Sequence, residues 1–146
     1  MPRAGTGIST RAISASHNAA ARRLCDDQRV PTTVLIVDDH DGFRESATSL
    51  LEAEGFDVVG AIAEGDAVLA AVERLRPAIV LLDVQLPGLD GFAVAERLAA
   101  TPDPPTVVLI SSRDAAAYGS RLQAVPARGF IAKRELTGDA VRKLVA

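Results

Sequence analysis

Five polar residues stand directly after apolar runs in this sequence. Asp38 and Asp39 follow the first run, Asp83 the third, Ser111 the fourth and Lys133 the fifth. Unbroken branched-aliphatic runs of this length are typical of parallel strands that are buried on both faces. Because open α/β sheets bind their ligands at the carboxyl ends of the strands, we expect these side chains to share one edge of a sheet.

The three aspartates among them would repel one another if they lay together without a cation. A hard divalent ion removes that repulsion, and Mg²⁺, with oxygen ligands and retained water, is the natural choice. We expect Asp39 and Asp83 to bind the ion directly and Asp38 to act mainly through water. The backbone carbonyl of Gln85 would complete the ligands from the protein.

A metal ion bound in this way leaves room for phosphate oxygens. An ionised Asp83 is then placed to attack phosphorus and form an aspartyl phosphate. Such a transfer requires that the charge on the equatorial oxygens be neutralised, which the metal and the Lys133 ammonium would do. Ser111 would donate a hydrogen bond to the remaining oxygen.

Each of these residues alone also has a plain structural explanation. Two aspartates after a strand are common in turns and N-caps, a lone serine is more often structural than a ligand, and a lysine at a strand end is usually solvated. Phe130 is by default a core aromatic residue. The combination favours a phosphate and metal site, because no packing requirement places these groups at the ends of four strands.

The apolar runs alternate with segments of helical periodicity. Strands are predicted at 34–37, 58–61, 78–82, 106–110 and 128–132. Helices are predicted between them and after the last strand, with Asp90 and Thr137 as N-caps and Gly55 as a stop. This alternation predicts an α/β fold, a doubly wound (βα)5 three-layer sandwich. Its parallel five-stranded sheet, in the flavodoxin-like order 2-1-3-4-5, would set the first and third strands side by side.

The segment between the fourth and fifth strands carries the weakest helical pattern. Its apolar face, formed by Tyr118, Leu122 and Val125, is interrupted by Gly119 and closed by Pro126. Both interruptions lower helix stability. We therefore expect a short helix here, and the most mobile element of the domain.

Composition divides the 146 residues into two regions. Residues 1–31 show no sustained periodicity and are predicted to be a disordered extension, although organelle transit peptides share their Arg- and Ser-rich, acid-poor composition. Residues 32–146 are expected to form one domain. The extension has five arginines against two aspartates, a net +3, and the domain has 11 basic against 17 acidic residues, a net −6. An acidic domain argues against direct nucleic acid binding by this chain.

The sequence carries no signal for a membrane or for export. No apolar stretch is long enough to span a bilayer, and the first residues lack the apolar segment of a secretory signal. The single cysteine, Cys25, cannot form an internal disulfide and fits a reducing compartment. We therefore expect a cytoplasmic protein without a membrane partner.

Four short motifs together carry a family resemblance. They are Asp38-Asp39-His40, Asp83-Val84-Gln85-Leu86-Pro87-Gly88-Leu89-Asp90-Gly91, Ile110-Ser111-Ser112 and Gly129-Phe130-Ile131-Ala132-Lys133. With them, residues 33–146 resemble a response-regulator receiver domain, the phosphoacceptor part of bacterial two-component systems. Details such as Phe43-Arg44-Glu45 and Leu50-Leu51 are most similar to the receivers usually joined to a helix-turn-helix output domain.

The resemblance implies a phosphorylation cycle. A histidine kinase or a phosphotransfer protein would donate the phosphoryl group of a phosphohistidine to Asp83 with Mg²⁺ bound. The domain would catalyse only this transfer and its own later dephosphorylation. Gln85 and Arg113 would flank the route of the hydrolytic water and tune the rate of dephosphorylation.

The resemblance also implies a switch. Ser111 would move toward the phosphate and Phe130 would turn inward. The surface formed by the weak helical segment, the fifth strand and the last helix would then shift and control an unknown downstream protein. A phosphorylation-dependent homodimer is a further arrangement that the family allows.

Two positions depart from the family pattern. Arg134 stands where many receivers have proline after the lysine, so we expect a trans peptide bond after Lys133. Val125-Pro126 replaces the small Ala-Gly pair that is common before the fifth strand. This replacement is expected to shorten the preceding helix.

Other functions stay open at this point. A pseudo-receiver would keep the fold and bind proteins without phosphorylation, and the chain could also be the receiver fragment of a DNA-binding transcription regulator. A haloacid-dehalogenase-type phosphatase would need a second aspartate two residues after Asp83, where Gln85 stands. A flavodoxin-like flavin-binding protein would need a Ser-, Thr- and Gly-rich loop after the first strand, where the sequence has acids.

Overall fold

The computed structural model describes residues 30–146, so the predicted extension at 1–31 lies outside the described residues except for its last two. The strands are β1 (Thr33–Val37), β2 (Asp57–Ile62), β3 (Ile79–Asp83), β4 (Thr106–Ser111) and β5 (Gly129–Ala132). The α-helices are α2 (Asp41–Ala53), α3 (Val68–Leu75), α4 (Gly91–Ala99), α5 (Arg121–Ala124) and α6 (Gly138–Val145). Short 3-10 turns, η3 (Gly65–Ala67), η4 (Ala115–Ala117) and η5 (Lys133–Glu135), lie between them.

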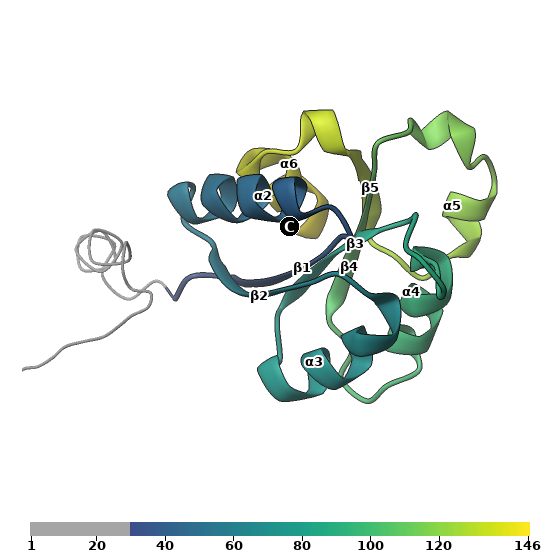
Figure 1. Ribbon diagram of the computed structural model, residues 1–146, viewed down its shortest axis with the longest axis horizontal. Helices are drawn as coiled ribbons and strands as arrows, with labels where there is room; N and C mark the ends of the chain where they lie inside the picture. The colour runs from purple at the N-terminus through teal and green to yellow at the C-terminus, as the bar shows by residue number, and fades with distance from the viewer. Residues whose placement is uncertain (1–29) are drawn as a thin grey trace, which may run out of the picture. The chain divides into compact units, whose positions relative to one another are not determined.

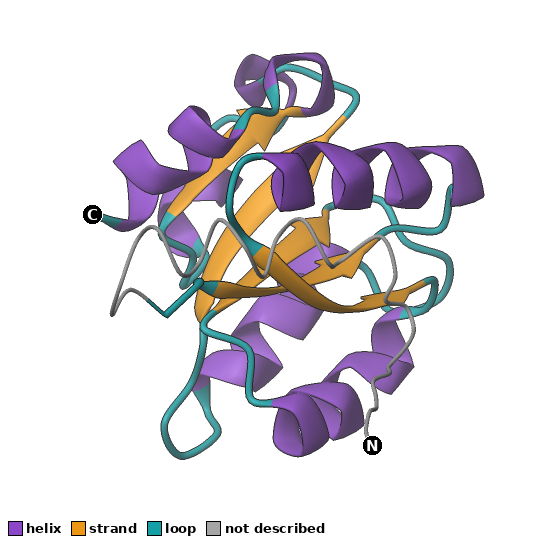
Figure 2. Cartoon of the chain, turned by 90° about the vertical axis from the view of Figure 1, so that its left-hand side faces the viewer, coloured by secondary structure: helices purple, strands orange, loops and turns teal. Residues whose placement is uncertain are grey.

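The five strands form one parallel sheet in the order β2-β1-β3-β4-β5. Helices α2 and α6 cover one face of this sheet, and α3, α4 and α5 cover the other (Figures 1 and 2). The prediction of a doubly wound (βα)5 sandwich is therefore confirmed. Because β1 and β3 are neighbours, their carboxyl ends lie side by side.

The core consists of two aliphatic layers, one on each face of the sheet. Alternate residues of β1 serve the two layers, with Leu35 and Val37 toward α3 and α4, and Val34 and Ile36 toward α2 and α6. Strand β3 has no exposed residue between Ile79 and Asp83. Burial on both faces explains why these strands read as continuous apolar runs.

The predicted helix ends agree with the structure. The side chain of Asp90 accepts a hydrogen bond from Ala93 N at 2.9 Å and so caps α4, and Thr137 Oγ1 accepts one from Ala140 N at 3.0 Å and so caps α6. Helix α5 has only four residues, which confirms the expected short helix.

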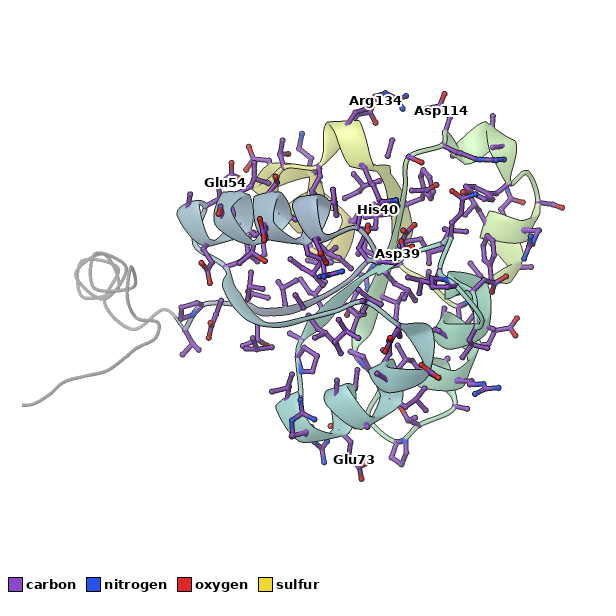
Figure 3. All side chains as sticks on the ribbon, in the orientation of Figure 1. Asp39, His40, Glu54, Glu73, Asp114 and Arg134 are labelled. Carbon is purple, nitrogen blue, oxygen red and sulfur yellow. The ribbon has the colours of Figure 1, made fainter. Side chains whose placement is uncertain are left out.

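Local features at the edge strand β2 and after β5 complete the fold. The pairing of β1 with β2 shifts between Val34 and Leu35, so that Val59 of the edge strand has no partner in β1. The chain turns into η5 directly after β5, and no cis peptide bond occurs in residues 30–146, as expected for Arg134 after Lys133. The side chain of Arg134 pairs with Asp114, on the loop after β4 (Figure 3). No helix in this range is long and apolar enough to cross a membrane.

Candidate functional site

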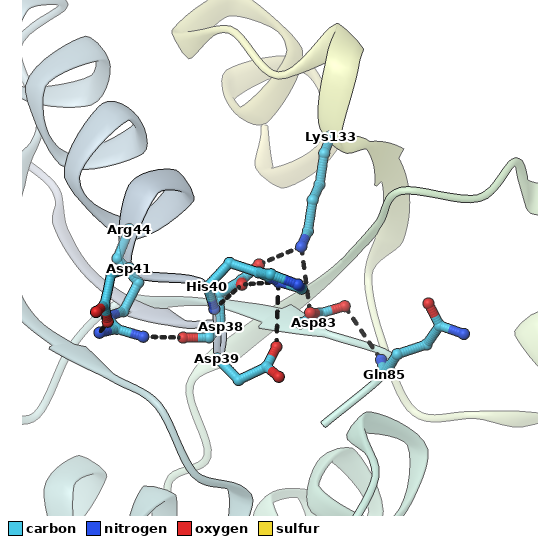
Figure 4. Close-up of polar contacts among 8 residues, drawn as sticks. All are labelled: Asp38, Asp39, His40, Asp41, Arg44, Asp83, Gln85 and Lys133. Carbon is cyan, nitrogen blue, oxygen red and sulfur yellow. Dashed lines mark hydrogen bonds and ion pairs between the residues drawn. The ribbon is translucent and has the colours of Figure 1, made fainter. Parts of the chain in front are cut away.

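The predicted acids and the lysine meet at the carboxyl edge of the sheet (Figure 4). Lys133 Nζ lies 2.5 Å from Asp38 Oδ2 and 3.2 Å from Asp83 Oδ2. Asp38 is fully buried at the end of β1, Asp83 is 2% exposed at the end of β3, and Lys133 reaches both from the end of β5. One ammonium is thus shared by two buried carboxylates.

The charges in this cluster change one another's ionisation. Burial raises the pKa of Asp83, and the nearby charge of Asp38 raises it further, while the Gln85 N–H and Lys133 partly oppose the rise. Burial by itself would lower the pKa of Lys133, but its ion pairs with Asp38 and Asp83 outweigh burial and raise it. Lys133 is therefore a fixed positive charge at neutral pH.

The geometry of the acids suits a bound cation. One oxygen each of Asp38, Asp39 and Asp83 lies within 4.8 Å of the others and of a His40 ring nitrogen. Asp38 Oδ2 pairs with the Lys133 ammonium at 2.5 Å, and Asp38 Oδ1 faces His40 and the other acids. Carboxylate oxygens grouped this closely are a donor set that fits a hard divalent ion.

His40 belongs to this cluster, although the sequence analysis gave it no role in the site. Its backbone N–H donates to Asp38 Oδ1 at 2.8 Å, and its Nδ1 lies 3.1 Å from that oxygen and 3.2 Å from Asp39 Oδ1. The imidazole is 69% exposed. Its position directly after an acid pair at the turn into α2 is the signal that could have identified it.

Helix α2 also supports the lysine and the acid pair. The Lys133 ammonium lies 4.7 Å from the centroid of the Phe43 ring, a cation–π contact. Arg44 Nη1 donates to the backbone carbonyl of Asp38 at 2.6 Å. From sequence, Phe43 was named only as part of the Phe43-Arg44-Glu45 stretch of the family resemblance, without a role in the site.

The loop after β3 holds the side chain of Asp83 and the backbone next to it in place. Gln85 N donates to Asp83 Oδ1 at 3.1 Å, and Gly91 N donates to Val84 O at 2.9 Å. A side chain at Gly91 would overlap the carbonyl oxygen of Asp83, so only glycine allows α4 to begin this close to the strand. The Pro-Gly-Leu-Asp-Gly stretch is therefore needed both to form the turn after β3 and to place the start of α4 close to that strand.

Ser111 has partners other than the acids. It is fully buried, its Oγ accepts a hydrogen bond from Arg113 N at 3.0 Å, and it lies 2.6 Å from the hydroxyl of Tyr118. The Tyr118 ring packs against Phe92 and Phe130, with centroids 5.7 and 6.0 Å apart. The contact with Tyr118 was not predicted, because sequence alone placed Tyr118 only on a weak helical face.

Comparisons with known proteins agree with this geometry. Residues 34–145 match the family model of the response regulator receiver domain. The chain is 34% identical over 111 residues to a protein-glutamate methylesterase/protein-glutamine glutaminase of Anaeromyxobacter dehalogenans, covering 75% of this chain and 32% of that protein. It is 30% identical over 101 residues to the DNA-binding transcriptional activator EvgA of Escherichia coli, covering 69% of this chain and 50% of that protein. The chain thus spans about a third to a half of the length of these relatives.

A solved structure extends the comparison to the whole fold. The signal receiver domain of the response regulator NarL from Mycobacterium tuberculosis superposes with a TM-score of 0.72 at 29% identity, covering 81% of this chain and 99% of that domain. Fold, motif positions and family match all concern the same part of the chain, residues 34–145. The chain therefore belongs to the response regulator receiver domain family of two-component systems.

Proposed function

We propose that this chain is a phosphoacceptor that takes a phosphoryl group onto Asp83 from a phosphohistidine of a histidine kinase or a phosphotransfer protein. The observation that carries this proposal is the position of Asp83 itself. Its buried carboxylate lies 3.2 Å from the Lys133 ammonium and within 4.8 Å of oxygens of Asp38 and Asp39. Such a site concentrates the groups that phosphoryl transfer needs.

The acids would hold a magnesium ion. Asp39 and Asp83 would be direct ligands, Asp38 would act mainly through water, and the backbone carbonyl of Gln85 would complete the set. The close grouping of oxygens from three carboxylates supports this assignment. When bound, the ion supplies positive charge that neutralises the oxygens of the phosphoryl group.

The transfer itself needs only Asp83 as nucleophile. An oxygen of its carboxylate forms a bond to phosphorus while the P–N bond of the donor breaks, and the electron pair of that bond leaves with the imidazole nitrogen. In hydrolysis a water oxygen attacks phosphorus, the aspartyl O–P bond breaks, and the carboxylate of Asp83 and inorganic phosphate are released. Lys133 stays charged and holds one phosphoryl oxygen, and Ser111 donates a hydrogen bond to another.

Gln85 and Arg113 would set the lifetime of the phosphorylated form. Both side chains are exposed, and each residue lies two positions after a site residue, Asp83 or Ser111. At these positions they flank the approach of water to the phosphorus. Exchanging the two residues for others should alter the dephosphorylation rate, and an unaltered lifetime would remove this assignment.

Phosphorylation would act on the surface formed by α5, β5 and α6. Ser111 would turn toward the phosphate and Phe130, which is half-buried in β5, would turn inward. Helix α5 is the element expected to move, because it has only four residues and Gly119 before it adopts a left-handed φ of 57°. Unchanged NMR signals of the α5 backbone on adding an acyl phosphate would count against this switch.

Acetyl phosphate with Mg²⁺ tests the core of the proposal. Intact mass measurement should show one added phosphoryl group on the wild-type protein and none on an Asp83→Asn variant. Wild-type protein that stays unmodified would favour a pseudo-receiver. Modification of both proteins would place the phosphoryl group elsewhere.

In this proposal the domain acts on its downstream protein by direct contact. The chain itself catalyses only its own phosphorylation and dephosphorylation. The methylesterase activity in the name of one relative is not extended to this chain, because the match covers 32% of that protein. A receiver portion of a DNA-binding transcription regulator also fits, since EvgA is named as a DNA-binding activator and is matched over half its length. Because the domain is acidic, we expect no direct nucleic acid binding by the described residues.

A further inference from the structure

Tyr118 occupies a position between the phosphorylation site and the surface expected to switch. Its hydroxyl lies 2.6 Å from Ser111 Oγ, and its ring lies between Phe92 of α4 and Phe130 of β5. Tyr118 follows η4 directly, and two residues lie between it and the start of α5. Apart from the His40 imidazole, no other aromatic side chain in the described part of the chain has a hydrogen bond to a residue of the site.

The hydrogen-bonding capacity of Ser111 decides which hydroxyl donates in this contact. A serine hydroxyl has one donor hydrogen and two acceptor lone pairs. One lone pair of Ser111 already accepts from Arg113 N at 3.0 Å. A phenol is the better donor and the poorer acceptor of the two hydroxyls, so Tyr118 donates to the second lone pair.

This direction has a consequence for the Ser111 hydrogen. With both lone pairs of Ser111 engaged by Arg113 and Tyr118, its own hydrogen is committed to neither of them. Ser111 is fully buried, so water cannot freely take that hydrogen either. The hydrogen is therefore free to be donated to a phosphoryl oxygen on Asp83, which is the role that the proposed function gives Ser111.

We propose that Tyr118 is a positioning residue, which fixes the Ser111 hydroxyl so that its hydrogen stays available for the phosphoryl group on Asp83. The inference rests on the proposed function, since it needs a phosphoryl group at Asp83. Through the ring contact with Phe130, the same residue links the state of Ser111 to β5.

Tyr118→Phe tests this role, because it keeps the ring and its contacts with Phe92 and Phe130 and removes only the O–H. The rate of phosphorylation by acetyl phosphate with saturating Mg²⁺ should fall by roughly three- to tenfold, the factor expected for one lost hydrogen bond. The same substitution in a Ser111→Ala background should have no further effect on the rate. A residue that merely stabilises the fold would slow both backgrounds equally.

The composition of the chain supplies an independent spectroscopic signature. Tyr118 is the only tyrosine and there is no tryptophan, so tyrosine fluorescence and absorption at wavelengths longer than the phenylalanine bands report on Tyr118 alone. Ser111→Ala should shift the Tyr118 absorption band of the unphosphorylated protein, because the phenol loses its acceptor.

Three results would overturn the inference. They are equal rates for wild type and Tyr118→Phe, an equal loss in the Ser111→Ala background, and a Tyr118 spectrum that Ser111→Ala leaves unchanged. Wild-type protein that gains no phosphoryl mass would instead refute the proposed function, and the positioning role with it. That outcome is distinct, because the other three are measured on protein that does react or without any phosphoryl donor.

Discussion

Asp83→Asn is expected to make the metal-free protein more stable, although it removes an ion pair. The substitution replaces a buried carboxylate by an amide of nearly the same size that can still accept the hydrogen bond from Gln85 N. It leaves Lys133 paired with Asp38 at 2.5 Å. The fold is therefore preserved, and the change in stability reports the electrostatics of the acid cluster.

The magnitude follows from the distances in the cluster and from burial. One oxygen of Asp83 lies within 4.8 Å of an oxygen of Asp38, and the Lys133 ammonium lies 3.2 Å from Asp83. At an effective dielectric constant of about 20, the repulsion from Asp38 costs at least about 3.5 kcal/mol and the attraction to Lys133 returns about 5 kcal/mol. Burial of the ionised carboxylate is the largest cause of its raised pKa and costs several kcal/mol, which leaves a net cost of roughly 2 kcal/mol.

Urea unfolding in the presence of a chelator measures this difference at neutral pH. The free energy of unfolding of Asp83→Asn should exceed that of the wild type by about 2 kcal/mol, a midpoint shift of about 1–2 M urea for a domain of this size. Glu73→Gln is the matched control, because Glu73 is exposed on α3 and lies away from Asp39 and His40 (Figure 3). It should change the midpoint little.

The same prediction implies that the stability difference between the two proteins depends on pH in a defined direction. Because burial raises the pKa of Asp83, the folded wild type keeps the proton of this carboxyl to a higher pH than the unfolded chain does. The resulting stability is fully present below the ordinary value of 3.8 and is lost as pH rises through the raised pKa. The gap between wild type and Asp83→Asn should therefore shrink as the pH is lowered toward 3.8.

A metal-free Asp83→Asn protein that unfolds at lower urea than the wild type would refute this reasoning. It would mean that the attraction between Asp83 and Lys133 outweighs the cost of burial together with the repulsion from Asp38. Added Mg²⁺ provides a second check. It should stabilise the wild type more than the variant, because the variant has lost one expected ligand.

Two further substitutions test other supports of the site. Gly91→Ala should lower the free energy of unfolding by about 1–3 kcal/mol in urea titrations, because the new Cβ overlaps the carbonyl oxygen of Asp83. Gly42→Ala, where nothing lies within 4 Å of the added Cβ, should be neutral or slightly stabilising. Phe43→Leu removes the ring 4.7 Å from the Lys133 ammonium and should slow phosphorylation by acetyl phosphate by roughly two- to fivefold. An unchanged rate would show that Phe43 serves packing alone.

The sheet and its helices could be predicted because their signals are local. Strands β1 and β3 are buried on both faces, so nearly every residue in them must be apolar. The caps at Asp90 and Thr137 depend on residues three positions apart. Once the strand order is known, the common edge of Asp38, Asp83 and Lys133 follows from topology alone.

The partners within the site could not be predicted in the same way. The contact of Tyr118 with Ser111 depends on how the loop after β4 turns through η4, and no period in the sequence specifies that path. The shift in pairing at Val59 likewise has no signal in an apolar strand, because neighbouring valines fit either register. Phe43 and Lys133 lie far apart in the sequence, so only the folded sheet brings the ring and the ammonium together.

Asp83 stands between two networks that phosphorylation would affect at once. On one side Lys133 is shared between Asp83 and Asp38, and a phosphoryl group, with its greater negative charge, would compete with Asp38 for the ammonium. On the other side Ser111 connects through Tyr118 to Phe130. Binding equilibria that are linked in this way are reciprocal. A downstream protein that prefers the phosphorylated arrangement of α5 and β5 must therefore also increase the fraction of Asp83 that carries the phosphoryl group at equilibrium.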